Sequence, residues 1–382
     1  GGRADRDGSQ QVLMKVVVIG AGIAGLSIGW RLAQAGAEVV VLDRAQPGTG
    51  ATIASAGMIA ATAENGDENS PVAKLGRASA ALWPAFAAEI EAVSHHKIGF
   101  RPEGTLLIAR NAAEAENHAA RARSVASAKL LTPGEARAME PMLADDITGA
   151  LFDPDEAQVD NRAIGLALSR AFVRAGGNLQ PNETVVRVEV EDGKVLGAVS
   201  QFTIYRADAY VLAAGAWTGR IEGLPPDILP PVVPVKGEMI ALSPGAGAAL
   251  PGHVIWGNEV YLVPRHGQLF VGATAERVGF DTTLTDAAAA WLRGQAAGLM
   301  PALAGWDQAE HWAGLRPGSP DDLPIIGETA VPGLYVASGQ YRNGILLAPV
   351  MAEVLRSLIL ERKSALDLSA FDPCRFTNTL VA

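Results

Sequence analysis

Six residues near the start of the chain, Gly20 to Gly25 (GAGIAG), constrain the fold more than any other feature. They follow a run of β-branched residues from Lys15 to Ile19, which is typical of a strand buried on both faces. The next residues predict a helix to about Ala35, where Gly36 stands in the position of a C-cap glycine. A second buried strand is expected over residues 38–42. The pattern therefore predicts a strand–turn–helix–strand unit at the start of an α/β domain.

The three glycines of this turn have distinct mechanical purposes in a dinucleotide site. Gly20 permits the tight turn, Gly22 lets the backbone approach a pyrophosphate, and Gly25 allows the helix to pack closely on the sheet. The pyrophosphate would lie at the helix N-terminus, where free N–H groups favour negative charge. Asp43, about 20 residues on, would accept hydrogen bonds from the adenosine ribose. We predict one dinucleotide, because no other segment repeats the pattern; the alternative is a glycine-rich turn in an ordinary α/β fold.

Composition excludes several classes of protein. A net charge of -10 argues against a nucleic-acid partner, and 49% apolar with 19% charged residues argue against disorder. The single cysteine, Cys374, cannot form an internal disulfide, and the scattered histidines have no metal-ligand spacing. The longest apolar stretch, Val12 to Trp30, contains Lys15 and several glycines, so we interpret it as strand plus helix, not as a membrane span. We expect a soluble, cytoplasmic protein without a metal.

A chain of 382 residues exceeds what one hydrophobic core usually supports, so two domains are expected. Helices are predicted over residues 70–96, 112–128, 161–174, 286–299 and 344–360, and short strands punctuated by Pro and Gly over residues 232–274 predict an antiparallel sheet. The predicted fold class is α/β: a Rossmann-like dinucleotide-binding domain with an inserted domain rich in antiparallel sheet. We assign residues 14–82, 150–220 and 312–366 to the first domain and residues 83–149 and 221–311 to the second. Residues 1–13 are interpreted as a disordered leader.

Further sequence blocks occur along the chain: SAGM (Ser55–Met58), AAGAW (Ala213–Trp217), PVKGE (Pro234–Glu238), YLVPR (Tyr261–Arg265), VGAT (Val271–Thr274), WAGLRPG (Trp312–Gly318) and RNGILLAP (Arg342–Pro349). In these blocks the chain resembles the D-amino-acid oxidase family of flavoproteins, and it is most similar to glycine oxidases of the thiamine-pathway type. The similarity extends from Met14 to about Leu360. The opening glycine turn and AAGAW are shared by many FAD oxidoreductases, whereas WAGLRPG and RNGILLAP together are much more specific.

The resemblance implies that the dinucleotide is FAD and that it is bound without a covalent link, since Cys374 lies outside the matched blocks. A helix beginning at Gly344 would stabilise negative charge on the reduced flavin ring. The cofactor-binding residues that the resemblance implies are Gly20, Gly22, Ile23, Ala24, Gly25, Asp43, Arg44, Thr52, Ala56, Gly57, Met58, Val185, Ala214, Gly215, Trp217, Arg342, Asn343, Gly344, Ile345 and Leu346.

The resemblance also implies how the substrate carboxylate is held. Arg316 matches the family's carboxylate-binding arginine, and a planar guanidinium suits this task because it bonds both oxygens. Its alternative interpretation is a structural ion pair with Asp321 or Asp322. Tyr261 matches a tyrosine whose hydroxyl binds the same carboxylate, and its alternative is a tyrosine packed in the sheet.

Two more residues are expected beside the flavin. Arg342 matches a residue near flavin and substrate, and its alternative is a structural arginine at a helix start. Met58 matches a residue over the flavin, and its alternative is ordinary core packing. After VGAT the family's glycine oxidase has a methionine in the pocket, and Ala275 stands here, which favours a wider pocket.

We therefore expect an FAD-dependent oxidase that deaminates glycine or a related small amino acid: sarcosine, another N-substituted glycine or a small D-amino acid. A hydride would pass to flavin N5, giving a 2-oxo acid and ammonia or an amine, and O2 would reoxidise the flavin to give hydrogen peroxide. No protein general base is expected, because no His, Asp or Glu stands out near the matched blocks. The family implies a homo-oligomer. The alternatives are a dehydrogenase of the same fold that reduces a quinone or a protein, and a non-catalytic FAD-holding subunit.

Overall fold

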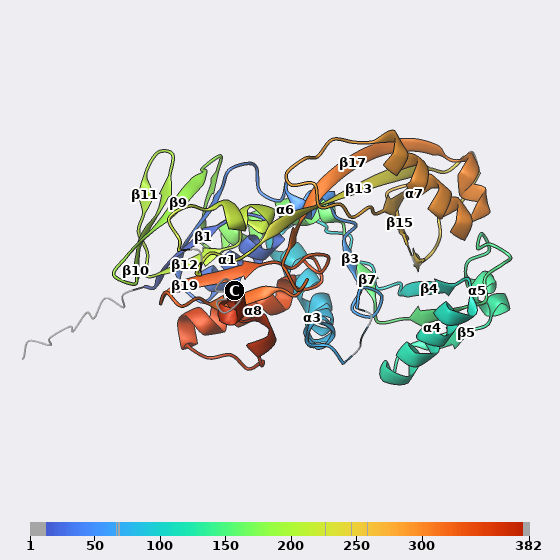
Figure 1. Cartoon of the computed structure of the whole chain (residues 1–382), viewed down its shortest axis with the longest axis horizontal. Coiled ribbons are helices and arrows are strands. Elements are labelled where there is room, and N and C mark those ends of the chain that lie inside the picture. Colours follow the sequence, from blue (N-terminus) through green and yellow to red (C-terminus); the bar gives the residue numbers. More distant parts are fainter. Residues whose placement is uncertain are drawn as a thin grey trace, which may run out of the picture.

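A six-stranded sheet and an eight-stranded sheet organise the two halves of the molecule in a computed structural model (Figure 1). The structure describes residues 13–65, 67, 69–225, 227–245, 247–257 and 259–376. The predicted leader lies outside these residues, apart from Leu13. The observed architecture confirms the predicted mixture of a Rossmann-like α/β unit with antiparallel sheet.

The six-stranded sheet grows from the predicted opening unit. Its order is β18 (Ile325–Glu328), β19 (Leu334–Ser338), β12 (Ala209–Leu212), β1 (Lys15–Ile19), β2 (Glu38–Asp43) and β8 (Asn178–Pro181). All neighbours are parallel except the antiparallel pair of β18 and β19. Both predicted strands of the opening unit are therefore central to the sheet.

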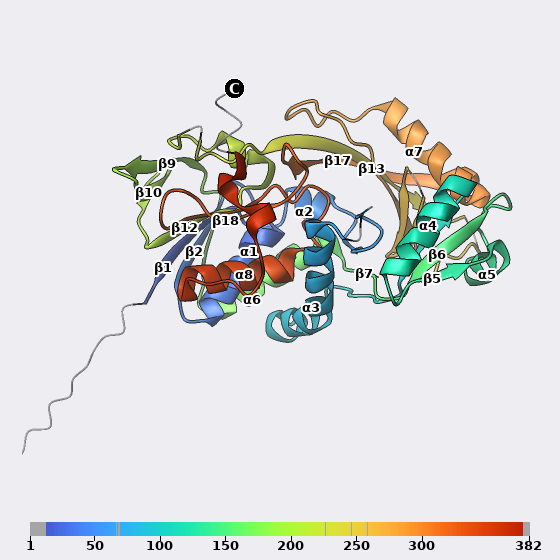
Figure 2. The ribbon, with the colours of Figure 1, turned by 60° about the horizontal axis from the view of Figure 1, so that its bottom comes forward.

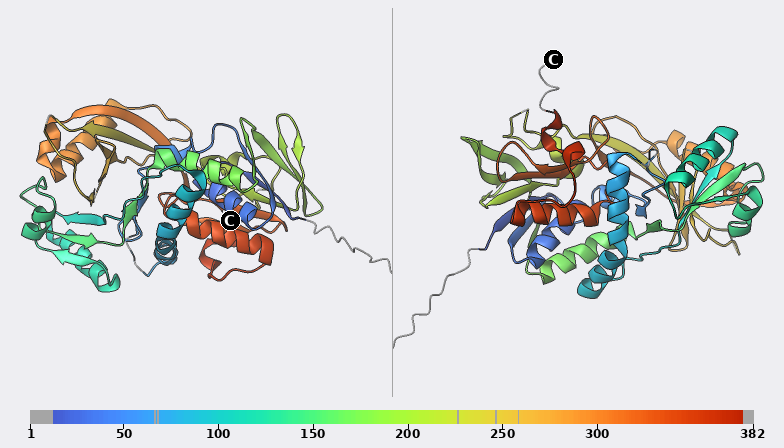
Figure 3. Two further views of the ribbon diagram at one scale, coloured as in Figure 1. Left: turned by 180° about the vertical axis from the view of Figure 1, so that it is seen from behind. Right: turned by 90° about the horizontal axis from the view of Figure 1, so that it is seen from below.

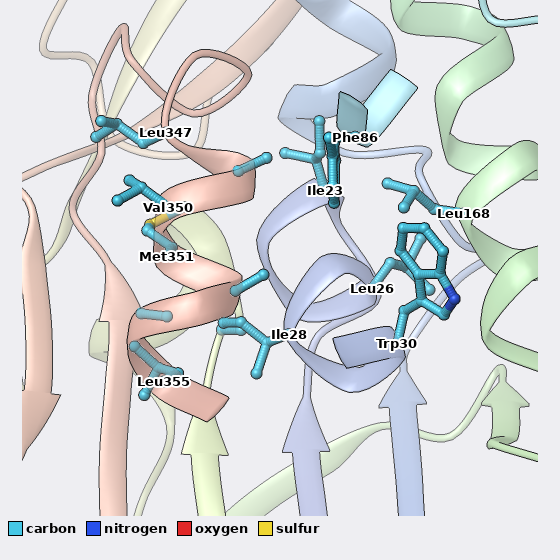
Figure 4. Close-up of a cluster of buried hydrophobic side chains, with 14 of the residues drawn as sticks. Ile23, Leu26, Ile28, Trp30, Phe86, Leu168, Leu347, Val350, Met351 and Leu355 are labelled. Atoms are coloured by element: carbon cyan, nitrogen blue, oxygen red, sulfur yellow. The ribbon is translucent and has the colours of Figure 1, made fainter. Parts of the chain in front are cut away.

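Alternate residues of β1 pack into two different cores, as the two-residue period of a strand requires. Val16 and Val18 face the helical side, which is formed by α1 (Ile23–Gln34), α3 (Pro71–Ser94), α6 (Asn161–Arg174) and α8 (Ala348–Glu361). Figure 4 shows α1 between α8 and α6, with Leu26 and Trp30 among the buried side chains. Val17 and Ile19 face the small sheet of β9 (Val185–Glu191), β10 (Lys194–Ser200) and β11 (Ile204–Tyr205).

The eight-stranded sheet carries the second half. Its order is β17 (Asp307–Gly318), β13 (Val233–Ser243), β16 (Gln268–Gly272), β15 (Tyr261–Arg265), β14 (Val254–Trp256), β4 (Thr105–Ala109), β6 (Gly149–Asp153) and β5 (Lys129–Leu131). Only β14 and β4 pair in parallel, so the antiparallel sheet predicted for residues 232–274 is confirmed. Helices α4 (Ala112–Ser124), α5 (Pro133–Met139) and α7 (Asp286–Leu299) lie around it (Figure 2).

Shorter elements complete the fold. Helix α2 (Ala51–Ala54) precedes the two-stranded sheet of β3 (Met58–Ile59) and β7 (Ala157–Gln158). Short 3-10 helices span Gly215–Arg220, Pro301–Gly305, Ser369–Phe371 and Pro373–Phe376. The long antiparallel pair of β13 and β17 extends from the first half into the second, as the two views in Figure 3 also show.

The predicted domain boundaries at residues 82 and 311 fall inside continuous elements. Residue 82 lies within α3, which packs against α6 and α8, and residue 311 lies within β17. β6 also pairs with β4 and β5 in the eight-stranded sheet, although the prediction grouped residues 150–153 with the opening unit. The division into two domains stays a prediction.

Helix α8 begins later than predicted. The prediction started it at Gly344, whereas residues 344–347 form a turn and α8 begins at Ala348. The Leu347 N–H donates to the Asn343 carbonyl at 2.8 Å, but the Ala348 N–H donates to the Ile345 carbonyl at 3.2 Å, which is a tighter turn. Pro349 has no N–H, so it cannot continue helical hydrogen bonds from this turn into α8. Proline is instead favoured in the first turn of a helix, which is where Pro349 lies.

Candidate cofactor and substrate site

One cavity of about 800 Å³ receives side chains from both halves of the molecule. Its lining includes the β1–α1 turn, the residues around α2, the Gly215–Arg220 helix, and parts of β13, β15 and β17. The predicted residues that line it are Gly20, Gly22, Ile23, Ala24, Asp43, Arg44, Thr52, Ala56, Gly57, Met58, Val185, Ala214, Gly215, Trp217, Tyr261, Arg316, Arg342, Gly344 and Ile345. Gly25, Asn343 and Leu346 are outside the lining.

The β1–α1 turn needs glycine for steric reasons at two positions. Gly20 has a φ of +111°, and a Cβ there would lie 2.3 Å from the Ala213 carbonyl oxygen. A Cβ at Gly25 would lie 1.9 Å from the Gly20 carbonyl oxygen, so a side chain there would push α1 away from the turn. At Gly22 the nearest atom is Thr52 Oγ1 at 3.6 Å, which leaves the start of α1 open.

Polar groups fix the β1–α1 turn and leave the N-terminus of α1 accessible from the cavity. Gly22 is the N-cap residue of α1 and has no side chain that could bond to the free N–H groups of the first turn. Thr52 Oγ1 accepts a hydrogen bond from one of them, the Ile23 N–H, at 2.9 Å. The Asp43 carboxylate accepts from the Ala21 N–H at 2.6 Å and from the Ala45 N–H at 2.8 Å. Burial raises the pKa of Asp43, and these two hydrogen bonds oppose the shift.

The cavity has space where a dinucleotide needs it. A Cβ built on Gly50, Gly215 or Gly344 would meet no atom within 4 Å, although all three residues line the cavity. The open N-terminus of α1 offers N–H groups to a phosphate. Arg44 lies over the Trp217 ring at 3.6 Å, so two of the predicted cofactor-binding residues are in contact with each other. These features fit a bound dinucleotide.

Arg316 lies on β17 with its guanidinium in the cavity lining. Its Nη1 donates to the Thr274 carbonyl at 3.0 Å and lies 3.4 Å from the Lys236 carbonyl. A Cβ at Gly237, on the neighbouring strand β13, would lie 2.4 Å from the same nitrogen. Glycine in the PVKGE block therefore provides the room that the Arg316 side chain occupies.

The alternative ion pairs of Arg316 are not formed. Asp321 pairs with Arg375 at 2.9 Å, and Asp322 lies 3.4 Å from Arg277. Within the described part of the chain Arg316 forms no ion pair, and two backbone carbonyls accept hydrogen bonds from its guanidinium. A cation that lines a cavity and lacks a carboxylate partner is available to a substrate carboxylate.

Tyr261, on β15, stands beside Arg316. Burial raises the pKa of the Tyr261 phenol, while the charge of Arg316 and a hydrogen bond with it act to lower that pKa. A Cβ at Gly272 would lie 2.5 Å from the Tyr261 ring, so the glycine of the VGAT block makes room for this side chain. The ring also packs against Trp256 at 5.3 Å between centroids, so Tyr261 both lines the cavity and belongs to the sheet packing.

Met58 and Arg342 both line the cavity. Met58 also packs against two buried clusters, which agrees with ordinary core packing, and its place over the flavin stays a prediction. Arg342 lies in the turn before α8 and not at the start of a helix. Ala275 is exposed and is outside the cavity lining, so its methyl group does not reach the cavity.

Glu64 is a cavity residue that no sequence pattern indicated. It follows β3 in an irregular segment, and it lines the cavity. Its Oε2 is out of contact with solvent and has no hydrogen-bond partner among the described residues. Burial raises the pKa of Glu64 to about 7, although Arg342 and Arg316 act to lower it. An isolated acid in an irregular segment carries no periodicity or motif, so sequence reasoning had no signal for it.

The described residues contain no group of three or more His, Cys, Asp or Glu arranged to hold a metal ion. None of the described helices combines the length and the apolar character that crossing a bilayer requires.

Residues 15–358 match the family model described as FAD dependent oxidoreductase. The chain belongs to this family. It is 33% identical to the glycine oxidase of Geobacillus kaustophilus, over 94% of this chain and 96% of that protein. The crystal structure of glycine oxidase from Geobacillus kaustophilus superposes with a TM-score of 0.89 at 32% identity, and covers 95% of this chain and 99% of its own.

A second relative is longer than this chain. The bifunctional protein ThiO/ThiG of Synechocystis is 36% identical over 97% of this chain, but the chain spans only 55% of the length of that protein. The chain is a member of the FAD-dependent oxidoreductases that is similar to glycine oxidases, and FAD is its cofactor.

Proposed function

We propose that this flavoprotein is an amino acid oxidase that removes the amine from glycine or a related small amino acid. The observation that carries the proposal is Arg316, a cation without an ionic partner among the described residues, in the cavity that fits FAD. The similarity to glycine oxidases over nearly the whole chain supports it. An arginine in this position recognises a carboxylate, which every amino acid carries.

The chain's own residues would act by position and charge. Arg316 binds the substrate carboxylate, and the Tyr261 hydroxyl beside it gives a second hydrogen bond. Arg342 also lines the cavity and adds a second positive charge. FAD, when bound, supplies the acceptor for the hydride that leaves the substrate carbon. Water then hydrolyses the resulting imine to a 2-oxo acid and ammonia or an amine.

The cofactor contacts belong to the same proposal. The open N-terminus of α1 holds the pyrophosphate, and Asp43 accepts from the ribose with the lone pairs that its two backbone hydrogen bonds leave free. The predicted use of O2, the homo-oligomer and the cytoplasmic location stay predictions.

Anaerobic reduction of the FAD-loaded protein tests the proposal. We expect glycine, sarcosine, D-alanine, D-proline or a longer N-alkyl glycine to bleach the visible flavin absorbance, and the order of rates to define the substrate. Under air, the peroxide formed should equal the amino acid consumed. Bleaching without peroxide would assign a dehydrogenase, and no bleaching by any of these compounds would refute amino acid oxidation.

A further inference from the structure

Glu64 lies in the proposed substrate region, and no contact within the fold accounts for a buried carboxylate at this position. Its Oε2 is removed from solvent and has no hydrogen-bond partner among the described residues, whereas buried polar atoms are normally paired. A group that lines a cavity and lacks a partner is paired when a ligand binds there.

The segment that carries Glu64 is held firmly. The buried Glu156 Oε1 accepts from the Thr62 N–H at 2.7 Å and from the Ala63 N–H at 2.8 Å. From α4, Arg121 donates to the Thr62 carbonyl at 3.0 Å. Three hydrogen bonds within two residues of Glu64 therefore restrict where its side chain can reach.

The charged groups around Glu64 come from several elements. Arg316 on β17 and Arg342 in the turn before α8 act electrostatically on its carboxyl, and Glu64 acts in turn on the Tyr261 phenol of β15. His118 of α4 lines the same cavity, and burial lowers its pKa. Glu64 is thus an acid among the groups that bind the substrate carboxylate.

The proposed reaction requires a neutral amine. An amino acid in water carries an ammonium group, which has no lone pair to stabilise the cation left when a hydride departs. A bound amino acid whose carboxylate is on Arg316 has its nitrogen only one carbon further away. An acceptor for the ammonium proton within the same cavity would therefore serve the reaction.

We propose that Glu64 is a catalytic residue that accepts the proton of the substrate ammonium group. The inference rests on the proposed function above. The N–H bond breaks, its electron pair stays on nitrogen, and the proton bonds to Glu64 Oε2. No atom is oxidised or reduced in this step, and the neutral amine is then ready to lose its hydride.

The environment of Glu64 suits this step. Burial raises the pKa of its carboxyl to about 7, and Arg342 and Arg316 prevent a larger rise. A base is most effective when its pKa lies near the working pH. Below that pKa Glu64 is protonated and cannot accept, so flavin reduction should accelerate as the pH rises through it.

Glu64→Gln tests the proposal because glutamine has the same size and cannot accept the proton. In anaerobic stopped-flow measurements at neutral pH, we expect glycine to reduce the flavin about a hundredfold more slowly in the variant. The pH at which reduction accelerates should move upward, toward the pKa of the free amine. A role in packing alone would lower the rate without moving this profile.

Equilibrium binding gives a readout that does not depend on turnover. Glycolate has the carboxylate of glycine and no ammonium group. By calorimetry with the FAD-loaded protein, Glu64→Gln should bind glycolate at least as tightly as the wild type, because a nearby negative charge is removed. Weaker glycolate binding would mean that the substitution damaged the carboxylate site, and it would overturn the proposal.

Glu91→Gln is the matched control. Glu91 is outside the cavity lining, and its carboxylate accepts from Lys97 Nζ at 2.7 Å and from the Ile98 N–H at 2.9 Å. Its rate and pH profile should stay those of the wild type. If Glu64→Gln fails to retain FAD, Glu64→Ala, which only removes atoms from the cavity, should give the same displaced profile.

The outcomes separate the two proposals. Wild-type flavin that no amino acid reduces would overturn both the oxidase and the role of Glu64. Wild-type flavin that glycine reduces, with the same pH profile in Glu64→Gln, would overturn the role of Glu64 alone. A displaced profile with intact glycolate binding would support it.

Discussion

At the scale of single residues, the candidate site depends on glycines that stand opposite functional side chains. Gly237 leaves space for the Arg316 guanidinium, and Gly272 leaves space for the Tyr261 ring. Both glycines lie on strands beside the residue that they accommodate. This explains why the PVKGE and VGAT blocks accompany the arginine and the tyrosine, since any larger residue would displace them.

Arg316→Leu should weaken substrate binding while the fold persists. A charge-assisted hydrogen bond contributes about 1.5–3 kcal/mol, so the KM for the amino acid should rise at least about tenfold. Steady-state kinetics on purified variants measures this. The control is Arg277→Leu, because Arg277 lies 3.4 Å from Asp322 and is outside the cavity lining. An unchanged KM in Arg316→Leu would remove the carboxylate role.

At the scale of elements, α1 begins so close to the turn before it that only glycine fits at position 25. Helix α7 has no such crowding at Gly294, so a glycine-to-alanine change should have opposite effects in the two helices. In α1 an alanine at position 25 meets the Gly20 carbonyl oxygen at 1.9 Å, whereas in α7 an alanine at position 294 meets no atom within 4 Å.

Gly25→Ala should lower the melting temperature and the FAD content of the purified protein, because α1 must shift away from the turn. Gly294→Ala should raise the free energy of unfolding by about 0.5–1 kcal/mol, because alanine favours an exposed helix position. Thermal melts and the flavin-to-protein absorbance ratio measure both. Equal behaviour of the two variants would refute the steric account of Gly25.

At the scale of the whole molecule, buried acids make stability depend on pH. Burial raises the pKa of Glu156 from 4.5 to about 8, against its hydrogen bonds from Ala63 and Thr62. The unfolded chain then ionises this group at lower pH than the folded protein does. By linkage, the free energy of unfolding falls as the pH rises from about 4.5 to about 8, and this contribution changes no further above that range.

Glu156→Gln should remove this loss, because the glutamine oxygen can still accept from the two N–H groups and carries no charge. We expect the stability of the variant relative to the wild type to increase between pH 5 and pH 8. Urea denaturation of both proteins across this range tests it. A difference that does not vary with pH would show that Glu156 ionises normally in the folded protein.

Some of this protein follows directly from local sequence. The opening strand, turn and helix need specific backbone geometry, and the glycines from Gly20 to Gly25 specify it. Helices α6 and α7 have the predicted bounds, since Asp160 and Thr285 cap their N-termini and a hydrophobic face continues to the end. An Asp-Gly pair likewise favours a hairpin turn, and Asp192 and Gly193 between β9 and β10 both have the positive φ that such a turn requires.

Other features depend on contacts between distant segments, and only the tertiary structure decided them. Strand β17 is half-exposed along most of its length and shows no clear alternation, so its pairing with β13 defines it as a strand. The sequence indicates Arg316 as the carboxylate-binding residue, but only the tertiary structure shows that Asp321 pairs with Arg375 and not with Arg316. Glu64 belongs to no motif, and its significance arises because β17, β15 and the turn before α8 surround it. Local backbone geometry is encoded by neighbouring residues, whereas burial and charge at a site come from residues far apart in the chain.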